Sequence, residues 1–413
     1  MVAERPIKRA IALAGGGPAV GLSIGALKSL KRAGITFDVW TCACIGAWLG
    51  VVYNQAEPGR EVEDSVDFFK RLFRPDAEYS RFPIAGVFAP DFQGMVKDSL
   101  EFTLNPKNYV NLVVPEAIQR AGDDLLKFAS DPRQWSFANL NSVFLNDVLA
   151  VNPLTRFMTS LMYLSSNNGL ARIFYPDSAF LNAIQFDRLY QPEKPAIYYN
   201  SYNMTQQRLE LFTNKKNSRG YGTIRAETLC ACSALPYIET PVTIGDDTYC
   251  EGATIDTVNF EHLLQNHPDL DEVWVSRILD RKQIRPTRNL YDSLNNLVML
   301  FASTTSEDDV KIFKYKLKEI GSKVRVVEIP VNHHVSYDWS WSNLERAILD
   351  GERATDAVLK AYAPALPAIA APPPPPALPP AAPEPVAATP APAISAPATP
   401  ARKAAVRKAK VNA

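Results

Sequence analysis

A glycine-rich stretch and a cysteine turn near the N-terminus contain the residue types of nucleophilic catalysis. Residues 15–21 read Gly-Gly-Gly-Pro-Ala-Val-Gly, and backbone N–H groups in such a loop can donate hydrogen bonds to an anion. Residues 42–47, Cys-Ala-Cys-Ile-Gly-Ala, follow an apolar run further along the chain. A sharp turn there would lift Cys44 above a sheet and aim its thiol at a helix N-terminus, where a nucleophile is activated.

A carboxylate far along the chain could act as the base for this thiol. Residues 249–253 read Tyr-Cys-Glu-Gly-Ala, which puts Glu251 on a turn after a short strand. From there Glu251 could take the proton of Cys44 as the sulfur attacks. Nucleotide binding is not favoured, because the glycine spacing matches neither Gly-x-Gly-x-x-Gly nor the phosphate loop. No metal or cofactor is predicted, since the Cys-x-Cys pairs lack the usual zinc spacing.

The segments around the two turns predict an α/β fold. An apolar strand precedes the glycines at residues 7–14, and a helix follows at 23–30 with Gly34 as its C-cap. A second strand at 37–41 leads into the cysteine turn, and the apolar stretch 47–53 is the next expected helix. Repetition of strand, turn and helix is typical of a largely parallel sheet covered by helices.

The rest of the chain divides into four expected regions. Residues 60–190 look mainly helical and are interpreted as a cap or insertion within a main domain at 7–260. Residues 261–362 are expected to form a C-terminal α/β extension packed on the core, and the Ala/Pro composition of 363–413 predicts a disordered tail with a basic end. The expected elements are helices at 62–73, 115–128, 145–164, 225–233, 290–318 and 344–359, and strands near 197–199, 208–212, 248, 273–276 and 323–329.

Composition restricts the partners and the compartment. The 413 residues include 44 Lys plus Arg and 44 Asp plus Glu, so no global attraction to nucleic acid is implied and none is predicted as a partner. The basic end of the tail is interpreted as a solvated charge run, with contact to a polyanionic surface as the alternative. The five cysteines are odd in number, which argues against a disulfide framework. No signal peptide or membrane-spanning run is recognised, so a cytoplasmic location is expected.

Taken together, the glycine loop, the cysteine turn and the segment around Glu251 resemble the patatin-like phospholipase family in its bacterial branch. The resemblance covers roughly residues 7–260, and residues 337–351 resemble the extra C-terminal region of that branch. It implies a patatin-like three-layer α/β/α fold with a largely parallel central sheet. It further implies that the backbone of Gly15, Gly16 and Gly17 forms the oxyanion hole.

The catalytic pair departs from the family pattern at both positions. Cys44 occupies the position of the nucleophilic serine, and Glu251 occupies that of the aspartate base. A thiol has a pKa of about 8.5, which a nearby anion raises and a helix N-terminus lowers, so the two effects oppose each other. The side chain of Glu251 is also one methylene longer than that of the family's aspartate, and misplacement of a catalytic group by about 1 Å can lower the rate roughly a hundredfold. Cys44 as a small buried residue and Glu251 as a turn residue are the alternatives.

Two functions from different classes are consistent with these residues. The first is a lipid acyl hydrolase that cleaves esters or thioesters through an acyl-enzyme on Cys44, with Glu251 as base. The second is a catalytically inactive member that binds lipid or acyl chains and acts as a regulatory or scaffold protein. Either function brings contact with a lipid surface, so the expected location extends to the periphery of membranes or lipid bodies. The oligomeric state stays open.

Two further groups of residues could contribute to the site. His333 and His334 follow a strand end and could place an imidazole near Cys44, although adjacent histidines on a loop are commonly solvated. The aromatic run Tyr337, Trp339 and Trp341 is interpreted as packing rather than as a ligand cage.

Overall fold

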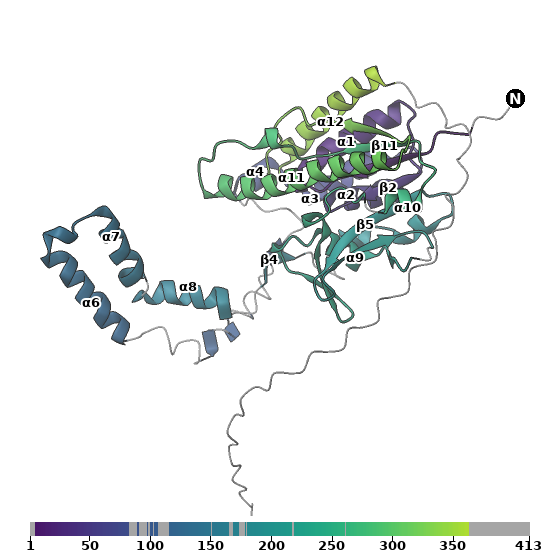
Figure 1. Cartoon of the computed structure of the whole chain (residues 1–413). Coiled ribbons are helices and arrows are strands. Elements are labelled where there is room, and N and C mark those ends of the chain that lie inside the picture. The colour runs from purple at the N-terminus through teal and green to yellow at the C-terminus, as the bar shows by residue number, and fades with distance from the viewer. Residues whose placement is uncertain are drawn as a thin grey trace, which may run out of the picture. The chain divides into compact units, whose positions relative to one another are not determined.

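The computed structural model describes most of the chain as far as Tyr362 (Figure 1). The described residues are 5–81, 89–90, 97, 100–101, 103–105, 115–149, 151–164, 168–172, 178, 180–216, 219–260 and 262–362. The predicted tail at 363–413 lies outside the described residues, as does much of the predicted cap between 82 and 114.

A nine-stranded sheet forms the centre of the described chain, in the order β12-β11-β1-β2-β5-β10-β9, with β6 paired to β5 and β7 to β6. The five strands from β12 to β5 run parallel, whereas β6, β10 and β9 add antiparallel pairs. The bounds are β1 (Arg9–Leu13), β2 (Val39–Cys42), β5 (Ala196–Asn203), β6 (Arg208–Thr213), β7 (Gly222–Thr223), β9 (Val242–Ile244), β10 (Asp247–Glu251), β11 (Glu272–Ser276) and β12 (Arg325–Ile329). The largely parallel sheet confirms the predicted fold class.

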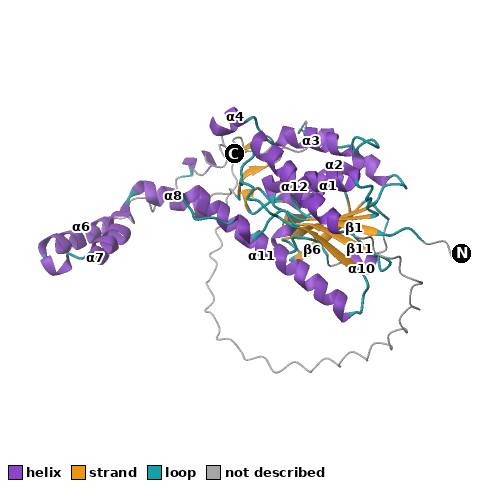
Figure 2. Ribbon diagram, turned by 90° about the horizontal axis from the view of Figure 1, so that it is seen from above, coloured by secondary structure: helices purple, strands orange, loops and turns teal. Residues whose placement is uncertain are grey.

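Helices cover both faces of this sheet because alternate strand residues point to opposite sides. Ile11 and Leu13 of β1 pack into one hydrophobic cluster, and Ala10 and Ala12 pack into another that includes Phe313. The helices of the first face are α1 (Val20–Arg32), α2 (Ile45–Gln55), α3 (Glu61–Leu72) and α12 (Trp341–Ala361), and those of the second are α10 (Leu263–Asn266) and α11 (Leu290–Glu319). Figure 2 shows the resulting three layers, with the strands between the two sets of helices.

Helix α12, which belongs to the predicted C-terminal extension, packs directly on α1. A Cβ added to Gly25 would lie 2.0 Å from the carbonyl oxygen of Ile348, and one added to Gly351 would lie 2.1 Å from that of Leu22. Only glycine permits such a close approach of two helix backbones. The chain therefore uses glycine on both helices to bring residues far apart in sequence into one layer.

The predicted continuous helix at 145–164 is wrong. A π-helical turn spans Phe144–Leu149, and a separate helix, α8, begins at Pro153 and ends at Leu164. Asn152 caps α8, because its Oδ1 accepts hydrogen bonds from the N–H groups of Leu154 at 2.9 Å and Thr155 at 3.2 Å. Proline has no N–H and its ring conflicts with a preceding helical turn, so the helix restarts there.

The remaining elements complete the described chain. The helices are α4 (Asp76–Arg81), α6 (Pro115–Ser130), α7 (Phe137–Val143) and α9 (Ala226–Ser233). A three-stranded sheet joins β3 (Ala89–Pro90), β4 (Gly169–Arg172) and β8 (Tyr237–Glu239), with β8 parallel to β4. No helix in the described part of the chain combines the length and apolar character needed to span a membrane.

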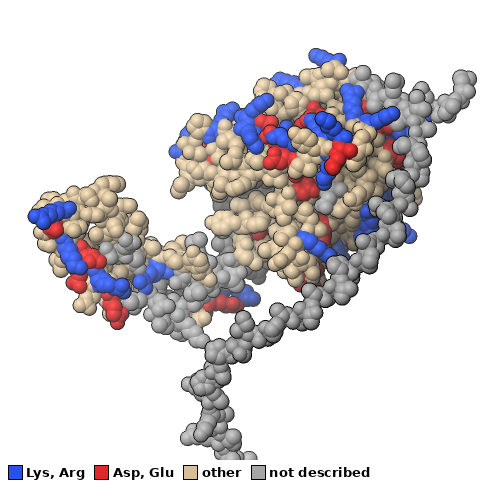
Figure 3. Space-filling view, viewed as in Figure 1, with Lys and Arg blue, Asp and Glu red and all other residues tan. Residues whose placement is uncertain are grey.

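Charged side chains of both signs are interspersed on the surface. Figure 3 shows Lys and Arg beside Asp and Glu over the face of the core that it presents. This distribution follows from the equal totals of 44 basic and 44 acidic residues. On this face charge alternates rather than forming a single-sign field, so electrostatic recognition has to be local.

Candidate active site

Cys44 lies on a strained turn between β2 and α2. Its backbone has φ 49° and ψ −127°, in the left-handed region that residues other than glycine rarely adopt. The N–H of Ala43 donates to the carbonyl of Leu13 at 3.0 Å, which ties the turn to β1. Gly46 is required beside it, because an added Cβ would lie 2.3 Å from the carbonyl oxygen of Leu13. The predicted sharp turn between strand and helix is therefore present at Cys44.

The glycine loop follows β1 and lines the same pocket as Cys44. The N–H of Gly15 donates to the carbonyl of Thr257 at 3.3 Å, which fixes the start of the loop. Gly17 has φ +53°, a conformation that favours glycine. Neither the N–H of Gly16 nor that of Gly17 donates to another described residue, so both are able to donate to a bound group. The structure thus brings the predicted loop and Cys44 together, but of the three predicted oxyanion donors Gly15 is already engaged with Thr257, which leaves Gly16 and Gly17.

Glu251 is the last residue of β10, and its carboxyl group lies beside Cys44, since a Cβ added to Gly15 would be 2.9 Å from the Cβ of Cys44 and 3.7 Å from Oε1 of Glu251. The side chain is buried, with only 6% of its surface exposed. Its backbone N–H donates to the carbonyl of Ala234 at 2.9 Å, which links the strand end to the end of α9. The two residues predicted as nucleophile and base therefore meet, although 206 positions separate residues 44 and 251 in the printed sequence.

Burial decides the protonation of this pair. It raises the pKa of the Cys44 thiol well above its ordinary value, and the neighbouring Glu251 carboxylate raises it further. The N–H of Ile45 at the start of α2 lowers the pKa of the thiol, but less than the other causes raise it. Burial also raises the pKa of Glu251 to about 7, against the lowering effect of the hydrogen bond from Cys44. A neutral thiol therefore faces a carboxyl group that can ionise near neutral pH.

A largely apolar pocket of about 710 Å³ opens over these residues. Its apolar and aromatic lining comprises Ile45, Trp48, Leu72, Ala171, Phe180, Leu235, Ile238, Ala253, Leu279, Leu294, Leu297, Val298, Phe301, Ala302, Tyr337 and Trp339. Tyr337 and Trp339 pack against the core cluster, as predicted, and also line the pocket. Trp341 lies elsewhere and donates its Nε1–H to the carbonyl of Lys70 at 2.9 Å.

Helix α11 also helps to position the site, although no motif within it indicates such a role. Asp309 accepts hydrogen bonds from the N–H groups of Thr257 at 2.8 Å and Val258 at 3.3 Å. The carbonyl of Thr257 in turn accepts from Gly15. Asp309 of α11 therefore holds Thr257, and Thr257 in turn holds the start of the glycine loop.

The histidines and the other cysteines occupy structural positions. His334 makes a hydrogen bond of 2.9 Å through Nδ1 with the carbonyl of Gln283, and neither it nor His333 is among the described residues that line the pocket. Burial raises the pKa of the Cys232 thiol well above its ordinary value, and the backbone N–H of Cys44 acts in the opposite direction. Within the described ranges there is no group of three His, Cys, Asp or Glu side chains placed to hold a metal ion.

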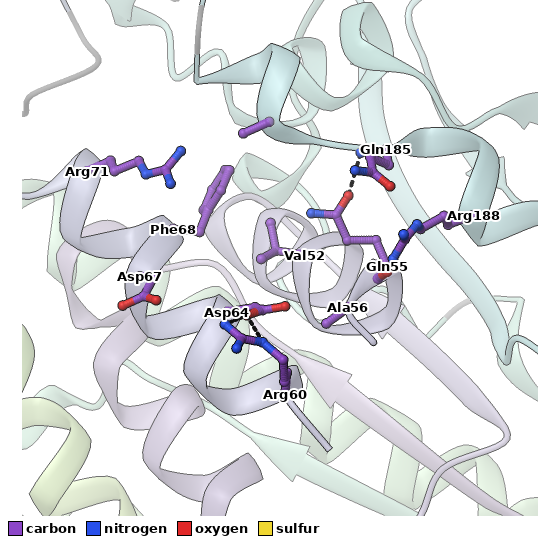
Figure 4. Close-up of a pocket in the computed structure, with 11 residues that line it drawn as sticks. Val52, Gln55, Ala56, Arg60, Asp64, Asp67, Phe68, Arg71, Gln185 and Arg188 are labelled. Atoms are coloured by element: carbon purple, nitrogen blue, oxygen red, sulfur yellow. Dashed lines mark hydrogen bonds and ion pairs between the residues drawn. The ribbon is translucent and has the colours of Figure 1, made fainter. Parts of the chain in front are cut away.

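A second, smaller pocket of about 270 Å³ lies between α2, α3 and the 3-10 turn Phe186–Tyr190 (Figure 4). Arg60 pairs with Asp64 at 2.8 Å, and the side chain of Gln55 accepts from the N–H of Gln185 at 2.5 Å. These polar groups satisfy one another, and the lining includes no nucleophile among the residues described. The chemistry is therefore assigned to the pocket at Cys44.

A cysteine on a strand–turn–helix elbow, a glycine loop and a buried glutamate thus meet at one pocket of a largely parallel α/β fold. The sequence model of the patatin-like phospholipase family matches residues 11–264, and the chain belongs to this family of lipid hydrolases. The match confirms the resemblance drawn from the three motifs. A comparison with curated proteins finds no match.

Solved structures that are similar to this chain include the following two. VipD from Legionella pneumophila is 13% identical, with a TM-score of 0.39 over 87% of this chain and 68% of VipD. The heterodimeric complex ExoU-SpcU from the type III secretion system of Pseudomonas aeruginosa is 13% identical, with a TM-score of 0.28 over 87% of this chain. The alignment covers 52% of the matched chain of that complex, so this protein corresponds to about half of its length.

Gly15→Ala is expected to reduce turnover about a hundredfold with little effect on the fold. An added Cβ would lie 2.9 Å from the Cβ of Cys44 and 3.7 Å from Oε1 of Glu251, so it would displace the reacting pair. Gly122→Ala in α6 is the control, since a Cβ there meets nothing within 4 Å. Hydrolysis rates and melting temperatures of both variants provide the measurement. Normal turnover by the Gly15 variant would contradict the assigned geometry.

Proposed function

We propose that this protein is a lipid acyl hydrolase that cleaves esters or thioesters through an acyl-enzyme on Cys44. The observation that carries the proposal is that the Cys44 thiol and the buried Glu251 carboxyl group lie side by side in the lining of an apolar pocket, where a Cβ added to Gly15 would touch both residues. A nucleophile with a base in hydrogen-bond reach is the arrangement that covalent acyl transfer requires. The apolar lining supplies a binding surface for an acyl chain.

The first half-reaction transfers the acyl group to sulfur. Cys44 Sγ attacks the carbonyl carbon while Glu251 takes the thiol proton, and the backbone N–H groups of Gly16 and Gly17 stabilise the oxyanion. The intermediate collapses with cleavage of the bond to the leaving oxygen or sulfur, which receives the proton from Glu251. In the second half-reaction water attacks the acyl-thioester, Glu251 takes its proton, and the carbon–sulfur bond breaks. The proton then returns from Glu251 to Cys44.

The raised pKa of Cys44 favours thioester substrates over oxygen esters. The thiol stays protonated at neutral pH, so the attack depends on proton transfer to Glu251 rather than on a preformed thiolate. Attack on a thioester exchanges one carbon–sulfur bond for another and releases a thiolate. Attack on an oxygen ester converts it to a thioester and releases a more basic alkoxide, which makes that step harder.

Contact with a lipid surface is the proposed setting for this reaction. The segment 293–306 within α11 carries no charged residue. Its residues Leu297 and Phe301 line the pocket, yet 51% and 67% of their surfaces are exposed. Exposed apolar side chains beside an apolar pocket suit partial insertion among acyl chains. We place the protein at the periphery of membranes or lipid bodies on the cytoplasmic side, where its five free cysteines would stay reduced.

A catalytically inactive, lipid-binding member is the second candidate. The burial that keeps Cys44 protonated is the specific observation in its favour, because a buried thiol is commonly inert. In that case the pocket would bind acyl chains without turnover, and the protein would act as a regulator or scaffold.

A panel of matched acyl esters and thioesters of graded chain length tests the proposal. The proposed hydrolase releases fatty acid from both series, with thioesters turned over faster than esters of the same acyl chain. The inactive protein binds the same chains but releases no acid, measured by titration of released acid against a binding assay with a fluorescent fatty acid. Binding without release from either series would overturn the hydrolase assignment.

A further inference from the structure

A second buried carboxyl group faces the pocket, and the reaction described above does not use it. Glu239 ends β8, has 6% of its surface exposed and lines the pocket together with Glu251. Its backbone N–H donates to the carbonyl of Leu235 at 2.8 Å. The side chain makes no hydrogen bond or ion pair with any residue in the described ranges. Neither carboxyl oxygen is among the fully enclosed, unpartnered side-chain atoms of the described residues, so the group opens to the pocket, where a role in binding would explain its presence.

The charges of the pocket point to the class of group that Glu239 would bind. The described lining residues include two carboxyl groups, Glu239 and Glu251, and no Lys, Arg or His. Burial raises the pKa of Glu239 well above its ordinary value, and the charge of Glu251 raises it further. A cation between the two would relieve their repulsion and replace the hydration that burial removes. A phosphate group would be repelled by these carboxyl groups, because no basic side chain of the described lining could neutralise its charge.

Aromatic side chains in the lining suit a bulky, weakly hydrated cation. Trp48 and Phe180 stack with ring centroids 5.4 Å apart, and both line the pocket. Tyr337 and Trp339 contribute two more rings to the lining. Aromatic faces attract ammonium groups, and most strongly quaternary ones from which water is excluded. The pocket thus combines a carboxyl group that has no partner among the described residues with an aromatic lining, in which Tyr337 and Trp339 are the less buried rings.

We propose that Glu239 is a specificity residue that binds the cationic ammonium group of the substrate. This inference rests on the proposed function, because it assigns the substrate class of the same pocket: acyl esters or thioesters that carry an alkylammonium group. On binding, the ammonium pairs with the ionised Glu239 carboxylate while the acyl carbonyl is attacked at Cys44. The substitution Glu239→Gln replaces the carboxyl group by a neutral amide, so it removes the charge but keeps the shape of the side chain.

The kinetic test uses two esters of the same acyl chain, one of choline and one of its neutral isostere 3,3-dimethylbutanol. The wild-type protein is expected to show a kcat/KM about tenfold or more higher for the choline ester. Glu239→Gln brings the ratio of the two kcat/KM values close to one, whatever its effect on the absolute rates, and Glu239→Asp retains the preference. Glu345→Gln, at a side chain that is 58% exposed, is the matched control. An unchanged ratio in Glu239→Gln would overturn the proposal.

A binding test separates this proposal from the hydrolase assignment. Binding of dodecyltrimethylammonium and of its neutral isostere is measured in the Cys44→Ala protein, which cannot form an acyl-enzyme. Tighter binding of the cation, lost when Glu239→Gln is added, supports the cation site even if no hydrolysis is ever found. Equal binding of the two probes, or a preference that survives Glu239→Gln, refutes the site even if hydrolysis is robust.

Discussion

Cys44→Ala is expected to lower the rate of thioester and ester hydrolysis by at least about a thousandfold. The substitution removes the atom to which the acyl group is transferred, and leaves only binding and the glycine loop to assist attack by water. The fold should persist, because alanine is a smaller side chain at a turn held by contacts to β1 and α2. Release of fatty acid, measured alongside the melting temperature, checks both parts of this expectation.

Cys230→Ala is the matched control for that variant. Cys230 is also a buried cysteine, with 5% of its surface exposed, but it is not among the described residues of the pocket. Near-normal hydrolysis by the Cys230 variant would show that the loss in Cys44→Ala is specific. If Cys44→Ala retained most of its activity, another residue or a bound water would have to be the nucleophile.

Glu251→Gln is expected to lower hydrolysis by about a hundredfold to ten-thousandfold, the usual contribution of a positioned base. The wild-type rate should rise with pH through about 7, because the carboxyl group must be ionised to accept the thiol proton and its pKa is raised to about 7. The Gln variant should show a low rate without this rise. A pH–rate profile that is the same in both proteins would remove Glu251 from the role of base.

The stability of Glu251→Gln should change in the opposite direction to its activity. A carboxyl group whose pKa is raised on folding from 4.5 to about 7 makes the folded state bind more protons, so stability falls as pH rises through that interval. In Glu251→Gln the neutral amide removes this loss of folding stability, which is on the order of 3 kcal/mol above pH 7. Unfolding by urea at pH 5 and pH 8 measures the difference.

Placing the serine and aspartate of the family at positions 44 and 251 tests whether Cys44 and Glu251 occupy the positions of the family's catalytic pair. Cys44→Ser alone places a hydroxyl before a carboxylate that is one methylene too long, so ester hydrolysis should be low. Adding Glu251→Asp should raise it by more than the two single changes together, because residues in contact are coupled. A double variant no faster than Cys44→Ser would contradict the equivalence of Glu251 with the family base.

The sequence predicts the reacting pair and its loop because each depends on local backbone geometry. Gly46 permits the turn at Cys44, Gly17 adopts a left-handed conformation, and Glu251 ends a strand, all of which leave signatures within a few residues. The order of the glycine loop, the cysteine turn and the Glu251 segment along the chain predicts that Cys44 and Glu251 lie together. Three motifs in a fixed order restrict the fold far more than one does.

The remainder of the site depends on packing between distant segments. Glu239 reaches the pocket because β8 pairs with β4, and Asp309 reaches the glycine loop because α11 packs across the sheet. Neither residue type is unusual in its local sequence, so no periodicity or spacing could identify it. The balance of effects on the pKa of Cys44 was likewise open, because burial can only be judged once the neighbours are placed.

Direct detection of the acyl-enzyme tests the central claim most directly. The protein is mixed with a dodecanoyl thioester, quenched in acid within the first turnover, digested and examined by mass spectrometry, with and without neutral hydroxylamine. The account predicts one dodecanoyl group on the peptide that contains Cys44, removed by hydroxylamine as a thioester is and absent from Cys44→Ala. Turnover with no acyl group on Cys44, or with a hydroxylamine-stable acyl group on another residue, would contradict it.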